Sequence, residues 1–184
     1  MSGASSGGFR AVDQQLLFRG SVVSLYRSVV EGPSGQRFER DVLRHPGAVI
    51  VAPIHQDRVL LVRQYRAAVD GELLELPAGK RDVPGEEPRD TARRELREEI
   101  GRTASSMKLL ASFYNSPGFC DEFSHCYMAT GLQQVPHSPQ GPEEAAMSLV
   151  DVRLADTPAM IASGEIVDAK TIIGITLARA ALGR

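Results

Sequence analysis

Three glutamates crowd one stretch of the chain in which most residues favour a helix. Glu95, Glu98 and Glu99 are three and one residues apart, and at about 100° per residue they share roughly 100° of a helical wheel. Like charges at such spacings repel one another by a few tenths of a kcal/mol per pair. The cluster calls for a counter-charge, and its hard oxygen donors suit Mg²⁺ or Mn²⁺. The alternative is a solvated helix neutralised by its own arginines.

The helix that must position these carboxylates is predicted over residues 88–100. It begins with a proline, continues with strong helix formers and ends at Gly101. Ala92, Leu96 and Ile100 form an apolar stripe about 80° wide on this helix. The acidic sector lies beside the stripe instead of opposite it, so the carboxylates are expected to border the core.

The rest of the chain is predicted to consist of strands interleaved with a few helices. Runs of β-branched and aromatic residues predict strands over residues 16–30, 36–43, 48–53, 59–65, 72–76, 107–114, 123–130 and 145–152. Helical patterns cover residues 157–163 and 169–181, and the Pro-, Gly- and Gln-rich stretch 133–142 is expected to be a mobile loop. Without internal repeats, this order indicates an α/β layered domain with a mixed sheet.

Length and composition exclude several classes of protein. The chain has 184 residues, of which 42% are hydrophobic and 24% charged, which is typical of a single folded domain. A net charge of −2 provides no general cationic field for nucleic acid, and the longest apolar stretch, 48–54, is too short to cross a bilayer. Without a signal-peptide pattern, we expect a cytoplasmic protein. Cys120 and Cys126 lack zinc-site partners and are expected to be free thiols.

The sequence around the acidic helix resembles the Nudix box, whose usual form is G-x5-E-x7-R-E-U-x-E-E-x-G-U with U apolar. Every fixed position from Glu86 through Arg94 to Gly101 matches. Two positions depart from the pattern: six residues instead of five separate Gly79 from Glu86, and Arg102 replaces the last apolar residue. The turn before the helix can absorb the extra residue, so neither departure affects the carboxylate sector.

Segments around the box narrow the resemblance to the ADP-ribose pyrophosphatase branch of the Nudix family. Residues 63–66, 72–79 and 116–122 are similar to its flanking motifs, and the proline that marks the branch corresponds to Pro117, 15 residues beyond Arg102. Together these similarities cover about residues 45 to 180.

The resemblance implies an α/β/α Nudix sandwich with a mixed sheet, preceded by an N-terminal β-ribbon. The Ser- and Gly-rich residues 1–8 are expected to be a disordered tail, followed by the ribbon over 9–45 and the Nudix domain over 46–184. Members of the branch typically form dimers that exchange N-terminal strands. We therefore expect a homodimer. Its expected small-molecule partner is a nucleoside diphosphate sugar, and neither nucleic acid nor membrane is expected as a partner.

The implied reaction is hydrolysis of the diphosphate of ADP-ribose to AMP and ribose 5-phosphate, with Mg²⁺ or Mn²⁺ as cofactor. The metal ligands implied by motif position are the backbone carbonyl of Ala78 and the carboxylates of Glu95, Glu98 and Glu99. Glu86 is expected to support the metal shell, and Arg94 is expected to orient the carboxylates by ion pairing.

The residues implied to bind the substrate lie in the segments around the box: Arg63, Arg66, Glu75, Pro117, Phe119 and Glu122. The two arginines suit a clamp on phosphate, and the two glutamates suit ribose hydroxyls or metal-bound water. Pro117 is expected to shape its loop, and Phe119 is a candidate for stacking on a base. Each also has a structural interpretation, as a polar strand face, a surface carboxylate or part of the core.

The general base implied by the branch is a glutamate on a mobile loop, here residues 133–144. Glu144 is favoured over Glu143 by its position relative to the box, and Glu98 on the helix is the competing candidate. Closure of the loop would bring the carboxylate to the reacting water only when the diphosphate is bound.

Two other functions remain open. The first is hydrolysis of another nucleoside diphosphate sugar. The second, from a different class, is a catalytically inactive Nudix-like module that binds a ligand. Such modules generally lose the box glutamates, whereas this chain keeps Glu95, Glu98 and Glu99.

Overall fold

The structure, a computed structural model, describes residues 6–137 and 140–184, except for the side chain of Glu143. The chain divides into two compact units: Met1–Pro46 with Tyr114–Phe123, and Gly47–Phe113 with Ser124–Arg184. Of the predicted tail, residues 1–5 lie outside the described part. The predicted domain boundaries stay predictions. None of the helices in the described residues is long and apolar enough to cross a membrane.

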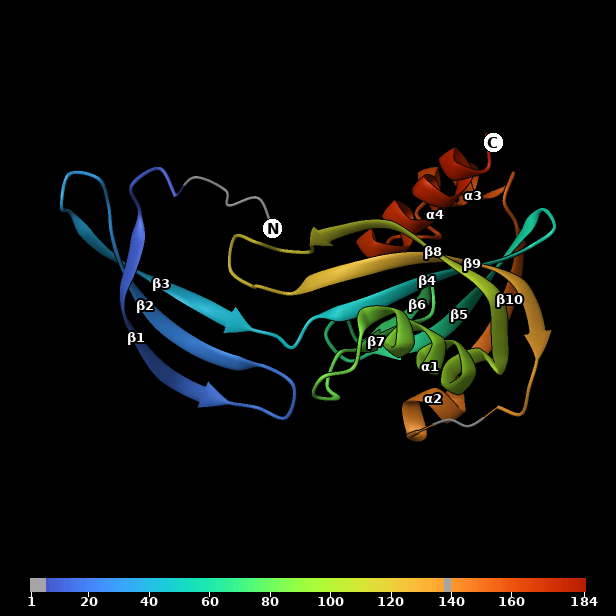
Figure 1. The fold of residues 1–184 in the computed structure, drawn as a ribbon, viewed down its shortest axis with the longest axis horizontal. Coiled ribbons are helices and arrows are strands. Elements are labelled where there is room, and N and C mark those ends of the chain that lie inside the picture. The colour runs from blue at the N-terminus through green and yellow to red at the C-terminus, as the bar shows by residue number, and fades with distance from the viewer. Residues whose placement is uncertain (1–5, 138–139) are drawn as a thin grey trace. The chain divides into compact units, whose positions relative to one another are not determined.

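Ten strands and four helices make up the described residues (Figure 1). In chain order they are β1 Arg10–Arg19, β2 Ser24–Glu31, β3 Arg37–Arg44, β4 Ala48–His55, β5 Arg58–Arg66, β6 Gly71–Glu75, β7 Ala78–Lys80, α1 Pro88–Ile100, β8 Arg102–Tyr114, β9 Phe123–Gln134, α2 Pro142–Ala146, β10 Ser148–Arg153, α3 Thr157–Ala162 and α4 Ala169–Ala181. The helix predicted over residues 88–100 is confirmed by α1, and that over 169–181 by α4.

The first unit contains an antiparallel sheet with the order β1-β2-β3. The prediction of one strand over residues 16–30 was wrong, because the chain turns back at Gly20, whose N–H donates to the carbonyl of Val23 at 2.8 Å. Glycine and serine at this turn interrupt an otherwise strand-like run. The β2–β3 turn lies where it was predicted, and Gly35 adopts a φ of 80° there.

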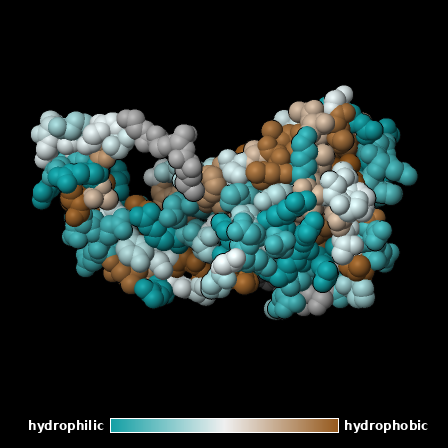
Figure 2. Space-filling model, in the orientation of Figure 1, coloured by the Kyte–Doolittle hydropathy of each residue, from teal (hydrophilic) through white to brown (hydrophobic). Residues whose placement is uncertain are grey.

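Apolar side chains of the first unit are exposed along β1. Leu16, Leu17 and Phe18 are 42%, 40% and 63% exposed, and they lie at a break in the register with β2, where Leu16 is opposite Tyr26 and Phe18 is opposite Leu25. Figure 2 shows hydrophobic patches among the hydrophilic side chains of this unit. By itself, the three-stranded sheet leaves much apolar surface in water.

The second unit is built on a seven-stranded mixed sheet. Its main order is β10-β5-β4-β9-β8, while β6 pairs with β5 and β7 pairs with β4. Strands β4 and β9 run parallel, and the pairs of β5 with β4, β6 and β10 are antiparallel. β4 and β5 pair only next to their tight turn. Beyond the turn, β5 pairs with β6 and β4 pairs with β7.

Helices cover both faces of this sheet, which confirms the predicted α/β/α sandwich (Figure 1). Side chains of β4 alternate between the two layers. Val49 and Val51 pack with Leu96 of α1, whereas Ile50 and Ala52 belong to the core on the α3 and α4 side. All of these side chains are buried, as expected for a central strand.

The region before β10 differs from the prediction. The strand predicted over residues 145–152 begins only at Ser148, because residues 142–146 form the short helix α2. Pro142 occupies the first turn, and the Glu-Glu-Ala-Ala sequence that follows favours a helix. The predicted loop is also shorter at its start, since β9 continues to Gln134. Residues 138–139 of that loop lie outside the described part.

Candidate active site

The acidic sector of α1 lies at the edge of the core. Ala92, Leu96 and Ile100 are buried, as the wheel predicted, and the neighbouring Glu95 and Glu99 are only 6% and 4% exposed. Burial of two carboxylates on one helix is costly unless opposite charge or hydrogen-bond donors compensate for it. The sequence therefore places these side chains where a partner is required.

Arg94 binds three of the carboxylates at once. Its Nη1 donates to Glu95 at 2.7 Å and to Glu98 at 3.0 Å. Its Nε and Nη2 both reach the carboxylate of Glu86 at 3.2 Å. A planar guanidinium with five donors can hold several carboxylates in fixed orientations. Arg94 thus has the orienting contacts expected of it.

The short strand β7 approaches the same face of α1. The N–H of Ala78 donates to Glu99 Oε2 at 2.9 Å. A Cβ added to Gly79 would overlap with the carboxyl group of Glu95. Gly79 is therefore needed for this close approach, and it lets the backbone of β7 lie directly beside the carboxylates.

Burial dominates the electrostatics of this site. It raises the pKa of Glu99 to about 8 and that of Glu95 to about 7, since desolvation disfavours the charged form. The negative charges of Glu95 and Glu144 raise the pKa of Glu99 further, while the Ala78 N–H lowers it. Arg94 in turn lowers the pKa of Glu95. Ionisation of both carboxyl groups therefore calls for additional positive charge, which a cation would supply.

The donor set fits a hard divalent cation by its chemistry. Carboxylate oxygens are the ligands that Mg²⁺ and Mn²⁺ prefer, and the raised pKa values of Glu95 and Glu99 show that one arginine does not fully compensate for their burial. In the conformation of the described residues, no three His, Cys, Asp or Glu side chains are gathered around a common centre for an ion. Arg94 Nη1 lies instead between Glu95 and Glu98.

Glu144 lies on α2, close enough to Glu95 and Glu99 to interact with them electrostatically. Its charge contributes to the raised pKa of both Glu95 and Glu99. The backbone N–H of Gln140 donates to Glu144 Oε2 at 2.6 Å, which fixes the carboxylate near the start of the helix. The side chain of Glu143 lies outside the described part. A short helix, rather than an open loop, thus carries the favoured candidate for the base.

Arg66 and Glu75 form an ion pair beside these carboxylates. Arg66 donates from Nε and Nη2 to the two oxygens of Glu75, at 2.8 and 2.7 Å, and Glu75 is 1% exposed. Glu75 first, and the charge of Glu99 to a smaller extent, raise the pKa of Arg66. Arg63 lies on the opposite face of β5, since successive side chains alternate. The two arginines therefore do not share a face.

Three of the predicted substrate residues belong to the first unit. Pro117, Phe119 and Glu122 lie between β8 and β9, in a segment joined to β3 by hydrogen bonds between Leu43 and Phe119 at 2.8 Å and between Asp121 and Leu43 at 3.1 Å. Phe119 is 57% exposed, so it is not part of a core. The structure gathers Ala78, Arg94 and the glutamates of α1 in the second unit.

Sequence reasoning missed the anchor at the start of α4. Thr171 Oγ1 accepts a hydrogen bond from the N–H of Leu76 and donates one to Asp168, both at 2.8 Å. Asp168 also caps the helix through the N–H of Thr171. An Asp before a helical pattern is a recognisable N-cap signal, but its link to Leu76 arises only in the folded chain.

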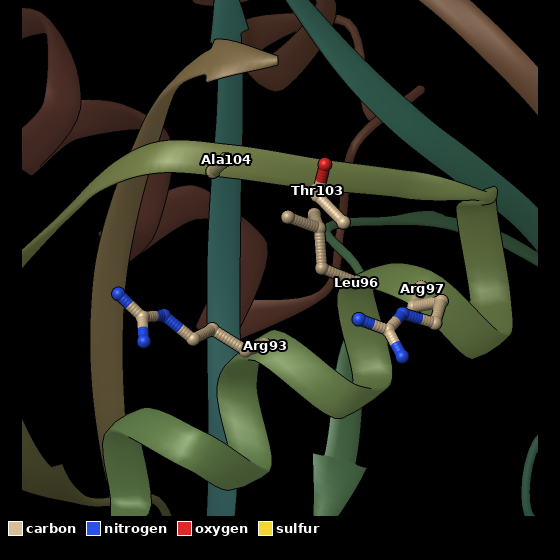
Figure 3. A pocket seen from close by; sticks show the side chains of 5 residues that line it. All are labelled: Arg93, Leu96, Arg97, Thr103 and Ala104. Atoms are coloured by element: carbon tan, nitrogen blue, oxygen red, sulfur yellow. The ribbon is translucent and has the colours of Figure 1, made fainter. Parts of the chain in front are cut away.

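A separate hollow of about 330 Å³ lies between α1 and the start of β8 (Figure 3). It is lined by Arg93, Leu96, Arg97, Thr103 and Ala104. On the helical wheel, Arg93 and Arg97 lie on the other side of the apolar stripe from the carboxylates. This hollow is therefore distinct from the acidic site.

Comparisons with known proteins point to one family. A family model described as NUDIX domain matches residues 43–170. Over about 90% of this chain, the sequence is 36% identical to an ADP-ribose pyrophosphatase of Bacillus subtilis and 38% identical to a methanol dehydrogenase activator of Bacillus methanolicus, covering 90% of each. It is 39% identical to an ADP-ribose pyrophosphatase of Mycobacterium tuberculosis over 91% of this chain and 81% of that protein.

A solved structure also shares the fold. A crystal structure of an ADP compounds hydrolase superposes with a TM-score of 0.85 and covers 98% of this chain and 97% of its own. The two sequences are 22% identical. The superposition supports the assignment of the α/β/α sandwich.

Proposed function

This chain belongs to the NUDIX family, and we propose that it hydrolyses the diphosphate of ADP-ribose to AMP and ribose 5-phosphate in the presence of Mg²⁺ or Mn²⁺. The observation that carries the proposal is the buried pair Glu95 and Glu99 on α1, with β7 directly beside it. Two relatives at 36% and 39% identity are named ADP-ribose pyrophosphatase, which supports this substrate over others. The relative from Bacillus methanolicus is named a methanol dehydrogenase activator, a name that states no chemical reaction and so does not favour another substrate.

In the proposed site, Glu95, Glu98, Glu99 and the carbonyl of Ala78 hold the cation. When bound, the cation supplies charge neutralisation for the phosphate oxygens and makes water a better nucleophile at neutral pH. Arg94 keeps the carboxylates apart and oriented through its contacts with Glu95 and Glu98. Its displacement from the position between them would open the cluster to the ion.

Glu144 is the proposed general base. The residue is half-buried, and its charge is close enough to Glu95 and Glu99 to raise the pKa of both. A general base has to lie within reach of the attacking water, and Glu144 is close to the carboxylates that are proposed to hold the cation. Glu98 on α1 remains the competing candidate because it lies within the same acidic sector.

The expected substrate contacts are retained in the proposal. Arg66 lies on the face of the carboxylates and is the proposed phosphate ligand. Pro117, Phe119 and Glu122 in the first unit, with Arg63 on the other face of β5, keep their expected roles as predictions. We also propose that the chain forms a homodimer through its N-terminal strands, because β1 exposes Leu16, Leu17 and Phe18. The expected cytoplasmic location likewise stays a prediction.

A substrate panel tests the proposed function. The purified protein is incubated with Mg²⁺ and ADP-ribose, GDP-mannose, dinucleotides or nucleoside triphosphates, and kcat/KM is ranked. ADP-ribose is expected to rank first, with AMP and ribose 5-phosphate as products. A higher kcat/KM for GDP-mannose would favour another nucleoside diphosphate sugar. Binding without turnover of any compound would favour the inactive ligand-binding module.

A further inference from the structure

The carboxylate of Glu75 is fully engaged inside the protein. Both of its oxygens accept hydrogen bonds from Arg66, at 2.8 and 2.7 Å, and Gln64 Nε2 lies 3.5 Å from Oε2. With 1% of the residue exposed, no free face of this carboxylate points to solvent. A direct contact to a ribose hydroxyl, which the sequence suggested, would require breaking the ion pair with Arg66.

Arg66 has donors left after this pairing. A guanidinium carries five N–H groups, and Glu75 takes two of them. The side chain of Arg66 is 38% exposed, so its remaining donors can reach a ligand. It lies on the same face of β5 as Val62, which packs in the core beneath α1. The free donors are therefore on the face where Glu95 and Glu99 lie.

The segment from Glu75 to Ala78 fixes this arrangement. Glu75 holds Arg66, and the next residue, Leu76, donates its N–H to Thr171 at 2.8 Å. The carbonyl of Pro77 accepts from the N–H of Val51 at 2.9 Å, and the N–H of Ala78 donates to Glu99 at 2.9 Å. Four consecutive residues thus connect the arginine, α4, β4 and the acidic helix. The position of Arg66 relative to Glu99 is set by a short piece of chain that is anchored at each of its four residues.

We infer that Glu75 is a positioning residue: it does not touch the substrate, but fixes Arg66 so that the remaining N–H groups bind a phosphate oxygen beside Glu99. This inference rests on the proposed function, since it assigns the phosphate ligand of the same site. A bidentate pair with a buried carboxylate restricts the guanidinium to one plane, which favours a planar, two-donor contact to phosphate. An unrestrained arginine would lose more side-chain entropy on binding.

A double-mutant cycle on Glu75 and Arg66 tests the inference. Glu75→Gln, Arg66→Ala and the double variant are compared with the unmodified protein for kcat and KM with ADP-ribose and Mg²⁺. We expect Glu75→Gln to raise KM roughly tenfold, and the double variant to be no worse than Arg66→Ala. Glu72→Gln, on the same strand but exposed, is the matched control and should leave KM unchanged. Additive effects of the two substitutions would overturn the inference.

Binding of ADP separates positioning from direct ribose contact. ADP lacks the distal ribose, and Ca²⁺ in place of Mg²⁺ provides a hard cation for a binding measurement by calorimetry. If Glu75 acts through Arg66, Glu75→Gln and Arg66→Lys should both weaken ADP binding about tenfold. Wild-type affinity of Glu75→Gln for ADP would contradict the inference. Failure of the unmodified protein to hydrolyse ADP-ribose would instead contradict the proposed function, while the ADP measurement would still test the pair.

Melting temperatures test whether Glu75 and Arg66 act as a pair even if a variant is too unstable for kinetics. Arg66→Ala leaves the buried carboxylate of Glu75 without its partner, so this variant should have a lower melting temperature. Adding Glu75→Gln removes the uncompensated charge and should restore part of the loss. A double variant less stable than Arg66→Ala would show that the two side chains do not act as a pair.

Discussion

At the scale of single residues, the site is organised by a shortage of positive charge. Glu95 and Glu99 are buried together, and Arg94 donates to Glu95 but not to Glu99 within the described contacts. Glu99 receives one backbone N–H, from Ala78. Burial therefore raises the pKa of Glu99 above that of Glu95. In the proposed function, a divalent cation supplies the missing charge.

Glu99→Gln tests this assignment. The substitution keeps the size of the side chain and an oxygen that can accept from Ala78, but it removes a charge. We expect kcat/KM to fall about 100-fold or more, while the melting temperature of the metal-free protein stays the same or rises. Glu87→Gln, at an exposed position just before α1, is the control and should retain activity. Near-normal turnover by Glu99→Gln would contradict the metal assignment.

The raised pKa values also predict how stability depends on pH. Glu95 and Glu99 titrate near 7 and 8 in the folded, metal-free protein, against an ordinary value of 4.5. Between about pH 4.5 and 8 the folded state binds protons that the unfolded state has released, so stability falls as the pH rises. Below pH 4.5 this contribution is fully present. Above pH 8 it is lost, at a cost on the order of a few kcal/mol.

The measurement compares melting temperatures in the presence of a chelator. Since other groups also titrate, the useful quantity is the difference between Glu99→Gln and the unmodified protein at pH 5, 6.5 and 8. We expect Glu99→Gln to become the more stable of the two as the pH rises. Added Mg²⁺ should stabilise only the unmodified protein at pH 8. A difference that does not change with pH would rule out the titration of Glu99.

The choice of base is tested by three matched amides. Glu144→Gln should lower kcat by roughly 10²–10⁴-fold with little change in KM or in the dependence on Mg²⁺. Glu98→Gln should weaken the dependence on Mg²⁺ as well as the rate, because Glu98 shares the carboxylate sector. Glu143→Gln is the control and should lose less than about tenfold. If Glu143 is essential and Glu144 dispensable, the base is Glu143 and our assignment is wrong by one residue. If both are dispensable, Glu98 on α1 is the base.

At the scale of elements, the site depends on how closely β7 approaches α1. Most strands keep helices at a distance set by their side chains, but β7 presents Gly79 at the contact with Glu95. The pairing of β7 with β4 and the hydrogen bond that the N–H of Val51 donates to the carbonyl of Pro77 hold this short strand in place. A three-residue strand thus brings backbone groups next to buried carboxylates.

Gly79→Ala is expected to damage both stability and activity. The added methyl group overlaps with the carboxyl group of Glu95, so either the side chain or β7 must move. Overpacking of this kind costs about 1–3 kcal/mol, and we expect kcat/KM to fall at least tenfold. The control is Gly71→Ala on β6, where the added methyl would meet only the carbonyl of Val69, at 3.7 Å. Equal effects of the two substitutions, measured by unfolding and kinetics, would show that the close approach is not required.

At the scale of the whole molecule, the two units differ in how they bury apolar surface. The second unit has helices on both faces of its sheet, with cores on either side. The first unit is a three-stranded sheet in which β1 is exposed along almost its whole length. Exposed apolar patches of this kind commonly mark protein–protein contacts. A second copy of the chain is the proposed partner.

Removal of residues 1–45 is expected to abolish both the dimer and the activity, because the N-terminal strands are proposed to complete the neighbour's site. Sedimentation velocity and the ADP-ribose assay provide the measurements. Leu16→Lys and Phe18→Lys place a charge on opposite faces of β1, since their partners Tyr26 and Leu25 are consecutive in β2, and they test the same interface without a deletion. A truncated protein that remains dimeric and active would contradict the proposal, as would unchanged association of both point variants.

The sequence alone determined the parts of the protein that depend on local patterns. Helix α1 was predicted with its bounds, its buried stripe and its acidic sector, because a helix of 13 residues carries its own periodicity and a glycine stop. The motif spacing identified the family for the same reason, since the fixed positions lie on one helix and the turn before it. By contrast, one strand was predicted where a glycine turn makes two, because a single Gly-Ser pair is a weak signal within a strand-rich run.

Only the tertiary structure decided how distant segments meet. Alternation along β5 separates Arg63 from Arg66, and burial turns Glu75 toward that arginine rather than toward solvent. Proline and helix-forming residues made α2 out of an expected loop, but its position near Glu95 follows from packing. The contact between Leu76 and Thr171 joins positions that are 95 residues apart in the chain, and the contact between Ala78 and Glu99 joins positions that are 21 residues apart. Such contacts depend on strand order and register, which no local pattern encodes.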